Sequence, residues 1–457
     1  MTQEYISNNK KRFLDELFSL LKIPSVSADM KFKEDVLSAA KFLEQNLIEI
    51  GAENVKIYPT EGHPIVYADK IISKDLPTIL VYGHYDVQPA DPYELWDTDP
   101  FSPIVKPTTI HPDGAVFARG ACDDKGQMFM HLKAFEAMNK TNTLHCNVKF
   151  MLEGEEEVGS ANLENFVRNN TQLLKSDVVL VSDTGIINND TPSICVGLRG
   201  LSYVEVEVTG PNRDLHSGLY GGGVANPINI LSSMISSLHD ENGKVNIPNF
   251  YNGVETVSNE LKNEWEKLTF SEEKFLNEIG MSKSSGEKGY SLLQKLWGRP
   301  TCEINGMWGG YIEEGLKTVI PSKAFAKISF RLVGDQDPED IRLNFRKKLR
   351  NEIPEDFEIK FSNHKGSKAT QFPLNDQVIN KAQKALNDEW NSNTVFEGGG
   401  GSIPIVQHFK NILEMDTLLV GFAQDDDNIH SPNEKYNLNS FYKGARSWVR
   451  IIYEISK

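Results

Sequence analysis

The chain has 457 residues, more than a single hydrophobic core usually serves, so its length predicts two domains. With 39% hydrophobic and 25% charged residues, its composition is that of a globular protein and excludes a disordered or fibrous chain. The formal charge of −16 argues against nucleic acid as a partner, because phosphate binding requires basic patches.

Membrane and secretory segments are also missing from the sequence pattern. The longest apolar runs, such as residues 416–423, are far shorter than the roughly 20 residues of a membrane-spanning helix. The first residues lack the apolar stretch of a secretory signal, so we expect a cytoplasmic protein without a membrane partner. Four scattered cysteines without a CxxC pair predict reduced thiols and neither a zinc ribbon nor a disulfide framework.

The first part of the chain alternates predicted helices and strands. Apolar residues at helical spacing predict helices near residues 13–21 and 34–50. Continuous apolar runs, typical of strands buried on both faces, occupy residues 77–87, 148–152 and 178–182. Helical patterns separate them at residues 127–139 and 161–169. The alternation predicts an α/β domain whose mostly parallel sheet is flanked by helices on both faces.

The pattern of apolar residues changes near Leu201. Strict alternation of apolar and polar residues at 203–208 (YVEVEV) predicts a sheet with one exposed face. Further elements of this part are a helix opened by Asn226 and Pro227, a strand at 326–333, and a helix capped by Asp337. After Phe372 the pattern of helices and buried strands returns, with a helix at 376–390, a strand at 417–422 and a terminal helix from Ser440. We therefore predict an α+β domain at residues 201–368, inserted between two parts of the α/β domain, 1–200 and 369–457.

The motif GHYDVQP, residues 83–89, places a histidine and an aspartate directly after a predicted strand. Residues two apart in extended chain face the same way, so Asp86 can orient His84 as a carboxylate does for a metal-bound imidazole. The alternative is an ordinary polar turn.

Two acidic motifs follow. Asp123 and Asp124 in RGACDDKGQ come just before a predicted helix, and could be metal ligands or simply cap that helix. EGEEEVGS, residues 153–160, crowds four carboxylates into five residues at a strand end. Like charges about 4 Å apart repel by roughly 4 kcal/mol at an effective dielectric constant of 20, so this cluster favours cation binding.

Asp183 and His430 are weaker signals when each is taken alone, since both can be ordinary loop residues. Together with the other motifs, however, four separate strand ends each supply a histidine or a carboxylate. Open α/β sheets bind ligands at the carboxyl ends of their strands, so the coincidence favours one shared site.

Taken together, the motifs resemble the M20 metallopeptidase family, and within it the carnosinase-like cytosolic nonspecific dipeptidases. The segments that carry the resemblance, in chain order, are GHYDVQP, WDTDPF at 96–101, RGACDDKG at 119–126, EGEEEVGS, SDT at 182–184, RDLHSGLYGG at 213–222 and DDDNIHSPNE at 425–434. The resemblance implies a catalytic domain that binds two metal ions, and an inserted lid domain that also mediates homodimerisation.

The same resemblance implies roles for the motif residues. His84 and Asp183 would hold one metal, Glu157 and His430 the other, and Asp123 would bridge both. Two divalent ions are expected, with Zn²⁺ preferred to Mn²⁺, although oxygen and imidazole ligands serve both. Glu156 would be the general base for a water that bridges the metals, and we expect it to point to a different side from Glu157. Asp86 would support His84.

In the inserted domain, His216 matches the histidine that stabilises the developing oxyanion from the partner subunit, although it could be a turn residue beside Gly218. Arg331 matches the residue that binds the terminal carboxylate of the substrate, a role that suits a guanidinium. Thr318, Ser402 and Gly401 fall at other substrate-contacting positions.

Three residues depart from the pattern of the branch: Cys122 before the aspartate pair, Gln127 where proline is common, and Glu155 as an extra acid. None removes a ligand, and a thiol at Cys122 leaves open an effect on metal choice or oxidation. The resemblance also implies a cis peptide between Asp123 and Asp124.

The sequence therefore predicts a hydrolase that cleaves the amide bond of dipeptides, with small peptides as substrates. An N-acyl amino acid deacylase or desuccinylase of the same chemistry is the alternative, since it also needs Arg331 for a carboxylate. A catalytically inactive binding protein of the same fold is a third reading, against which the full set of ligands and base argues.

Overall fold

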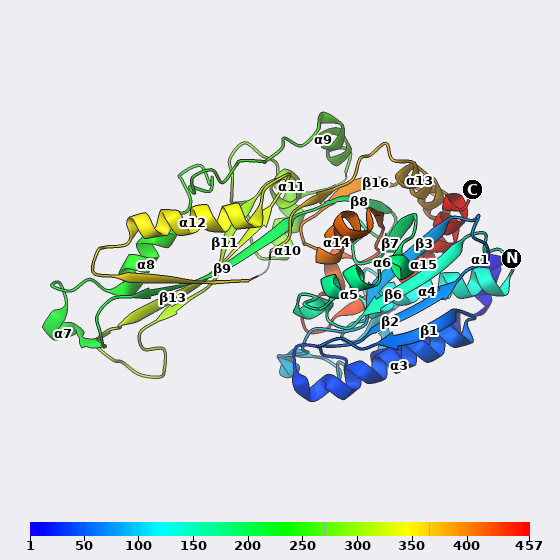
Figure 1. The fold of residues 1–457 in the computed structure, drawn as a ribbon, viewed down its shortest axis with the longest axis horizontal. Coiled ribbons are helices and arrows are strands. Elements are labelled where there is room, and N and C mark those ends of the chain that lie inside the picture. Colours follow the sequence, from blue (N-terminus) through cyan, green and yellow to red (C-terminus); the bar gives the residue numbers. More distant parts are fainter. Residues whose placement is uncertain (269, 365) are drawn as a thin grey trace. The chain divides into compact units, whose positions relative to one another are not determined.

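The computed structural model describes residues 1–268, 270–364 and 366–457, and the chain divides into two compact units (Figure 1). Three segments form the first unit: Met1–Val196, Phe372–Glu397 and Pro404–Lys457. The second unit consists of Gly197–Gln371 and Gly398–Ile403. The second unit is thus inserted in the sequence of the first.

The first unit is built on a sheet with the strand order β1-β2-β6-β3-β7-β17-β8, and β16 pairs with β8. Its strands are β1 (Glu53–Tyr58), β2 (Ile65–Lys70), β3 (Thr78–His84), β6 (Asn147–Glu153), β7 (Val178–Val181), β8 (Ser193–Leu198), β16 (Val395–Gly399) and β17 (Asp416–Leu419). The four neighbours β6, β3, β7 and β17 run parallel, whereas β1, β2 and β8 pair antiparallel. The predicted, mainly parallel central sheet is confirmed.

Helices cover both faces of this sheet, as two adjacent residues of β3 show. Neighbouring residues of a strand point to opposite faces. A Cβ atom on Gly83 would meet Met128 of α4 (Lys125–Lys140), whereas the Tyr82 ring lies 5.8 Å from the ring of Phe409 in α14 (Pro404–Leu413). The predicted arrangement of helices around the sheet is therefore correct.

Four further helices of the first unit lie close to their predicted positions: α3 (Lys33–Glu49), α5 (Leu163–Asn169), α13 (Gln377–Trp390) and α15 (Leu438–Ile455). The short α6 (Thr171–Leu174) and α14 were not predicted. The terminal helix α15 packs against α4 and α13. A small sheet of β4 (Ile104–Lys106), β5 (Ala115–Phe117) and β18 (Lys435–Asn437) completes the unit.

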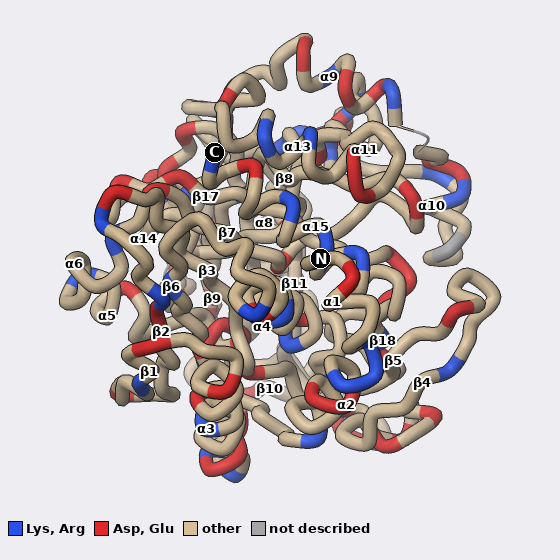
Figure 2. Tube along the Cα trace, turned by 90° about the vertical axis from the view of Figure 1, so that its right-hand side faces the viewer, with Lys and Arg blue, Asp and Glu red and all other residues tan. Residues whose placement is uncertain are grey.

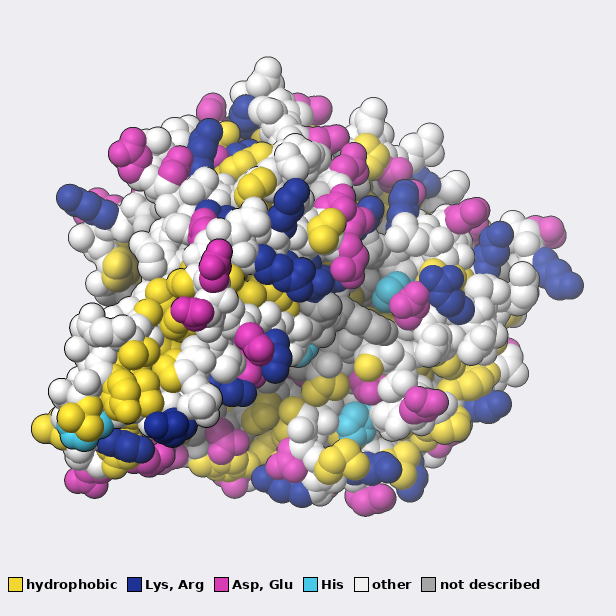
Figure 3. Space-filling view, turned by 60° about the vertical axis from the view of Figure 1, so that its left-hand side comes forward, with side chains coloured by type: hydrophobic (Ala, Val, Ile, Leu, Met, Phe, Trp, Pro, Cys, Tyr) yellow, Lys and Arg dark blue, Asp and Glu magenta, His cyan; other side chains and the backbone are white. Residues whose placement is uncertain are grey.

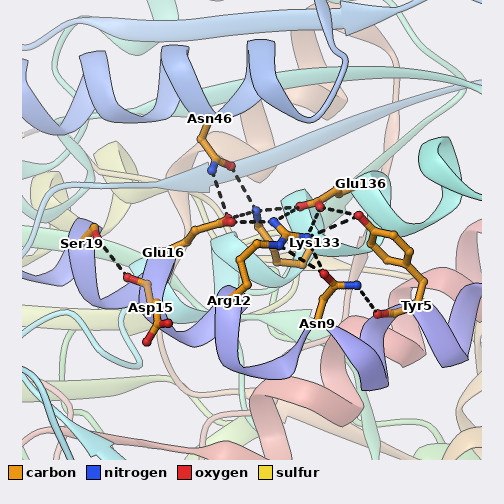
Figure 4. A network of polar contacts seen from close by, with 9 residues as sticks. All are labelled: Tyr5, Asn9, Arg12, Asp15, Glu16, Ser19, Asn46, Lys133 and Glu136. Carbon is orange, nitrogen blue, oxygen red and sulfur yellow. Dashed lines mark hydrogen bonds and ion pairs between the residues drawn. The ribbon is translucent and has the colours of Figure 1, made fainter.

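A network of charged side chains ties the N-terminal helices α1 (Thr2–Asn8) and α2 (Lys10–Leu21) to α4 (Figure 4). The fully buried Lys133 ammonium lies 3.0 Å from a Glu136 carboxylate oxygen and also pairs with Glu16. Arg12 pairs with both of these glutamates. Because each buried charge has an opposite partner, burial of these groups is tolerated.

The second unit contains a four-stranded antiparallel sheet of order β11-β13-β9-β14. Its strands are β9 (Gly200–Thr209), β11 (Thr301–Gly309), β13 (Lys323–Leu332) and β14 (Glu358–Asn363). Side chains of β9 alternate between buried and partly exposed, which confirms the expected one-sided sheet. The helices α8 (Pro227–Ser236) and α12 (Pro338–Glu352) pack against β9, and their predicted caps, Asn226 and Asp337, accept backbone hydrogen bonds.

The smaller elements of the second unit are β10 (Leu215–His216), β12 (Val319–Ile320), β15 (Thr370–Gln371), α7 (Ser217–Tyr220), α9 (Asn259–Glu266), α10 (Glu272–Glu278) and α11 (Leu292–Gly298). This unit also exposes large apolar side chains, and Figure 3 shows hydrophobic residues gathered on one of its faces. The most exposed of them are Leu219, Ile312 and Leu316.

The state of the cysteines agrees with the prediction from the sequence, and charged residues of both signs are spread along the chain. Figure 2 shows acidic and basic residues interspersed along the trace. All four cysteines lie in the described residues, are buried and form no disulfide. Within the described residues, none of the helices has the length and apolar character needed to cross a membrane.

Candidate metal centre

The four parallel strands bring the predicted ligands to one edge of the first unit's sheet. β3 ends at His84 itself, and β6 ends just before the short 3-10 turn that contains Glu156 and Glu157. Asp183 follows β7 by two residues, and the loop after β17 carries His430. Since the four strands are direct neighbours, their carboxyl ends lie side by side.

Asp123 lies at the centre of these side chains. Its Oδ1 is 3.1 Å from His84 Nε2, and its Oδ2 is 2.9 Å from His430 Nε2. His430 Nε2 is also 3.3 Å from Glu157 Oε2. Two groups of potential metal ligands result, each with its atoms within 4.8 Å of one another: His84, Asp123 and Asp183 in one, Asp123, Glu157 and His430 in the other. The structure thus brings all five predicted ligands together, and the two groups share Asp123. The peptide between Asp123 and Asp124 is cis, as the resemblance implied.

Asp86 is completely buried and holds two parts of the site. Its Oδ1 lies 3.4 Å from His84 Nδ1, on the side of the ring opposite the nitrogen that faces Asp123. Its two carboxylate oxygens accept hydrogen bonds from the backbone N–H groups of Glu156 and Glu157, at 3.2 and 3.1 Å. One carboxylate therefore fixes the histidine at the end of β3 relative to the glutamate turn after β6.

The charges at the site perturb one another. Hydrogen bonds to Asp123 and Glu157 raise the pKa of His430 to about 10. Burial alone would raise the pKa of Asp123, but its hydrogen bonds with His430 and His84 outweigh burial and lower it. Burial, together with the nearby Asp123 charge, raises the pKa of Asp183 to about 7. The carboxylates are thus crowded enough that an added positive charge would stabilise them.

Glu156 and Glu157 differ in their partners although they are adjacent. Glu157 Oε2 accepts a hydrogen bond from Gln88 Nε2 at 2.8 Å, in addition to its contact with His430. The Glu156 carboxylate makes no hydrogen bond to any part of the chain that the structure describes. Burial, outweighing the nearby His84, raises its pKa well above the usual glutamate value.

The donor set fits two divalent cations. Imidazole nitrogens and carboxylate oxygens are ligands that both Zn²⁺ and Mn²⁺ accept. A third group of similar residues, His111, Asp426 and Asp427, does not fit in the same way. The Lys435 ammonium lies 2.9 Å from Asp426 and 2.7 Å from Asp427, so this group already holds a cation.

The predicted substrate-binding residues and the predicted catalytic residue His216 belong to the second unit, where they form two clusters. His216 pairs with Val319 across β10 and β12, and the carbonyl of the adjacent Thr318 accepts a hydrogen bond from Ser217 N. Arg331 Nη1 donates to Ser402 Oγ at 3.0 Å, next to Gly401. A Cβ atom at Gly401 would meet no protein atom within 4 Å, so this loop is open to close approach.

The departures from the branch pattern have structural partners. Gln127 is buried, donates to the Thr184 carbonyl at 3.2 Å and accepts from Phe422 N at 2.7 Å. Glu155 accepts both of its hydrogen bonds from the Asn162 amide. The buried Cys122 thiol donates to Asp427, and burial raises its pKa well above the usual value, so it stays protonated.

The structure places three polar residues beside the proposed ligands: Gln88 and Glu434, to which the sequence analysis gave no role, and Asp124, which it gave only as a possible ligand or helix cap. Gln88 bonds Glu157, and Asp124 Oδ2 accepts from His84 N at 3.2 Å. Glu434 Oε1 accepts from Asp123 N at 3.1 Å. All three lie inside the motifs GHYDVQP, RGACDDKG and DDDNIHSPNE, so their position within these motifs was the sequence signal that could have identified them.

The sequence model of peptidase family M20/M25/M40 matches residues 80–454. The chain belongs to this family. It is 31% identical to the "Cys-Gly metallodipeptidase dug1" of Schizosaccharomyces pombe, over 99% of this chain and 97% of that protein. The protein is therefore a metallopeptidase, as the motifs implied.

Two solved dipeptidase structures have the same fold. The "Di-peptidase Dug1p" of Saccharomyces cerevisiae superposes with a TM-score of 0.87 at 28% identity, over 100% of this chain and 98% of that one. Human carnosine dipeptidase 1 superposes with a TM-score of 0.86 at 26% identity, with the same coverage of 100% and 98%. The resemblance to the carnosinase-like branch is thereby confirmed.

Proposed function

We propose that this M20 metallopeptidase hydrolyses the peptide bond of dipeptides with two divalent metal ions. The observation that carries the proposal is the position of Asp123, which belongs to both groups of potential ligands. His84, Asp123 and Asp183 would hold one ion, and Asp123, Glu157 and His430 the other. The names of the relatives, which are dipeptidases, support the choice of substrate.

Bound at this site, two ions of Zn²⁺ or Mn²⁺ would supply Lewis acidity to the scissile carbonyl and to the attacking water. Glu156 is proposed as the general base: it takes a proton from that water and delivers it to the departing amine nitrogen. Its free carboxylate beside the ligand Glu157 supports this division of roles. Asp86 holds His84 and the turn of Glu156 and Glu157 in fixed relative positions through its contacts with both.

The second unit is proposed to bind the rest of the substrate. Arg331 would bind the terminal carboxylate, with Ser402, Gly401 and Thr318 as further contacts. His216, supplied by the partner subunit, would stabilise the developing oxyanion. This role needs a homodimer formed through the second unit, and the apolar side chains exposed there support such an interface. We also propose a cytoplasmic location for the enzyme.

A substrate panel tests this function. The purified chain, loaded with Zn²⁺ or Mn²⁺, is assayed on dipeptides, on a tripeptide and on acetylated and succinylated amino acids, with metal content measured in parallel. We expect about two ions per chain and turnover of the dipeptides, which a chelator abolishes. Activity on the acylated amino acids alone would establish the deacylase alternative, which shares the need for a carboxylate-binding Arg331. A chain that holds no metal and turns over nothing would be the inactive binding protein.

A further inference from the structure

The Glu434 carboxylate is fully buried and accepts four hydrogen bonds from a single turn of the chain. Oε1 accepts from the backbone N–H groups of Cys122 and Asp123, at 2.9 and 3.1 Å. Oε2 accepts from Gly120 N at 2.7 Å and from the Arg119 guanidinium at 2.8 Å. Each oxygen thus has two donors, and all of them lie in the five residues that end at Asp123.

The conformation of the turn at residues 119–123 depends on Gly120 and on the Glu434 carboxylate. Gly120 has a φ of +76°, and a Cβ atom there would lie 2.4 Å from Val87 Cγ1, so only glycine fits. The turn directs three N–H groups toward one point, which is the geometry of a backbone anion site. Without the carboxylate, three backbone donors of this largely buried turn would have no partner, which is unfavourable.

Glu434 belongs to the loop that carries His430, four residues earlier. The residue before it, Asn433, anchors the same loop by donating to the Leu95 carbonyl at 3.0 Å and accepting from Asp97 N at 2.8 Å. The His430 loop and the Asp123 turn, which are about 300 residues apart in sequence, are therefore joined by hydrogen bonds to one carboxylate as well as by the contact between the two ligands themselves.

We propose that Glu434 is a positioning residue for metal binding: it fixes the backbone of Asp123 relative to the His430 loop, so that both ligand groups form together. The inference rests on the proposed metal ligands. This role differs from that of a merely structural ion pair with Arg119, because two of the four hydrogen bonds come from the backbone N–H groups of the shared ligand Asp123 and its neighbour Cys122. Replacing supports of this kind typically weakens metal binding about 10- to 100-fold.

The test compares metal affinity in three full-length variants. Glu434→Gln has only one acceptor oxygen, so it can satisfy one pair of donors and not the other. Glu434→Asp keeps the negative charge beside Arg119 but is one methylene too short to reach both pairs. Glu389→Gln is the matched control, since Glu389 is a largely buried carboxylate of the same unit that pairs with Arg446 and Arg450 and, within the described chain, with none of the proposed ligands. Dissociation constants for Zn²⁺ are measured by competition with a chromogenic chelator, and folding by circular dichroism.

We expect both Glu434 variants to bind Zn²⁺ about 10- to 100-fold more weakly than the parent chain, with the larger loss at the ion that involves His430. Glu389→Gln should lose thermal stability without a change in affinity. A folded Glu434 variant that binds two ions within threefold of the parent would overturn the positioning role. If the parent chain itself binds no divalent ion, the proposed function fails, and that outcome is distinct from the first.

Discussion

Four glutamates lie close together at the end of β6 and just after it, and each has a different environment. Glu153 accepts hydrogen bonds from two buried hydroxyl groups, and Glu155 from an asparagine amide. Glu157 contacts an imidazole and a glutamine amide, whereas Glu156 makes no hydrogen bond within the described chain. The proposed base is therefore the one carboxylate of this set that is free to exchange a proton.

Glu156→Gln tests this role. Glutamine keeps the size of the side chain but cannot accept the proton of the attacking water, so kcat should fall by about 10²- to 10⁴-fold or more. Metal content and the circular dichroism spectrum should stay as in the parent chain. Glu155→Gln, one residue earlier, is the control and should retain most activity. Full activity of Glu156→Gln would assign the base elsewhere.

Glu153 makes the stability of the metal-free chain depend on pH. Burial raises its pKa to about 8, against hydrogen bonds from Tyr82 and Ser160 that lower it. The folded chain keeps this proton while the unfolded chain releases it near the ordinary glutamate value. Its stabilising contribution is therefore complete below that value and is lost as the pH rises through about 8.

Glu153→Gln should remove this dependence, because the amide is neutral at every pH. With chelator present, the Tm of the variant minus that of the parent should increase by a few degrees between pH 5 and pH 8. Glu389→Gln serves as a comparison, since loss of its arginine contacts should lower Tm at both pH values. A constant difference for Glu153→Gln would show that Glu153 ionises normally.

The motif resemblance was sufficient to predict which five side chains come together at the sheet edge. Four of them lie at or after recognisable strand ends, whereas Asp123 precedes α4, and their binding of metal ions stays a prediction. The supports were not predictable in the same way. Gln88 and Glu434 lie within the motifs, but nothing in their spacing says that one bonds Glu157 and the other the backbone of Asp123. Such contacts depend on loop conformations that form only in the folded chain.

At the level of elements, the four parallel strands were predicted within a few residues, since each is a continuous apolar run. The predicted strand at residues 77–87 extends beyond β3, because Val87 N bonds the Ser25 carbonyl instead of a neighbouring strand. The antiparallel edge was not predicted. β1 is polar and partly exposed, without a continuous or alternating pattern, and its position depends on pairing with β2.

Gln127 joins three of these elements, since it connects α4 to the residues that follow β7 and β17. Gln127→Ala would leave the buried Phe422 N–H and the Thr184 carbonyl without this partner. We expect the free energy of unfolding to fall by about 1 to 3 kcal/mol, measured by urea denaturation. Gln45→Ala, at an exposed site on α3, should change it by less than about 0.5 kcal/mol. Equal effects of the two substitutions would contradict a specific role for Gln127.

At the scale of the whole molecule, the exposed apolar residues of the second unit predict self-association. Light scattering after gel filtration should give about twice the chain mass of 51.4 kDa. Leu316→Glu, which places a charge on a fully exposed leucine of this unit, should shift the mass toward the monomer. Met30→Glu changes a comparably exposed apolar residue of the first unit and should have no effect. A strict monomer at assay concentrations would remove the proposed role of His216.

The proposed ligands are spread from His84 to His430, with the whole second unit between Asp183 and the last of them. During synthesis, the inserted unit leaves the ribosome before the strand and loop that complete the first sheet. The central sheet of the nascent first unit therefore lacks β17 and cannot be completed until nearly the last residues have emerged. Acquisition of the complete pair of ions should accordingly be one of the final events in the maturation of the enzyme.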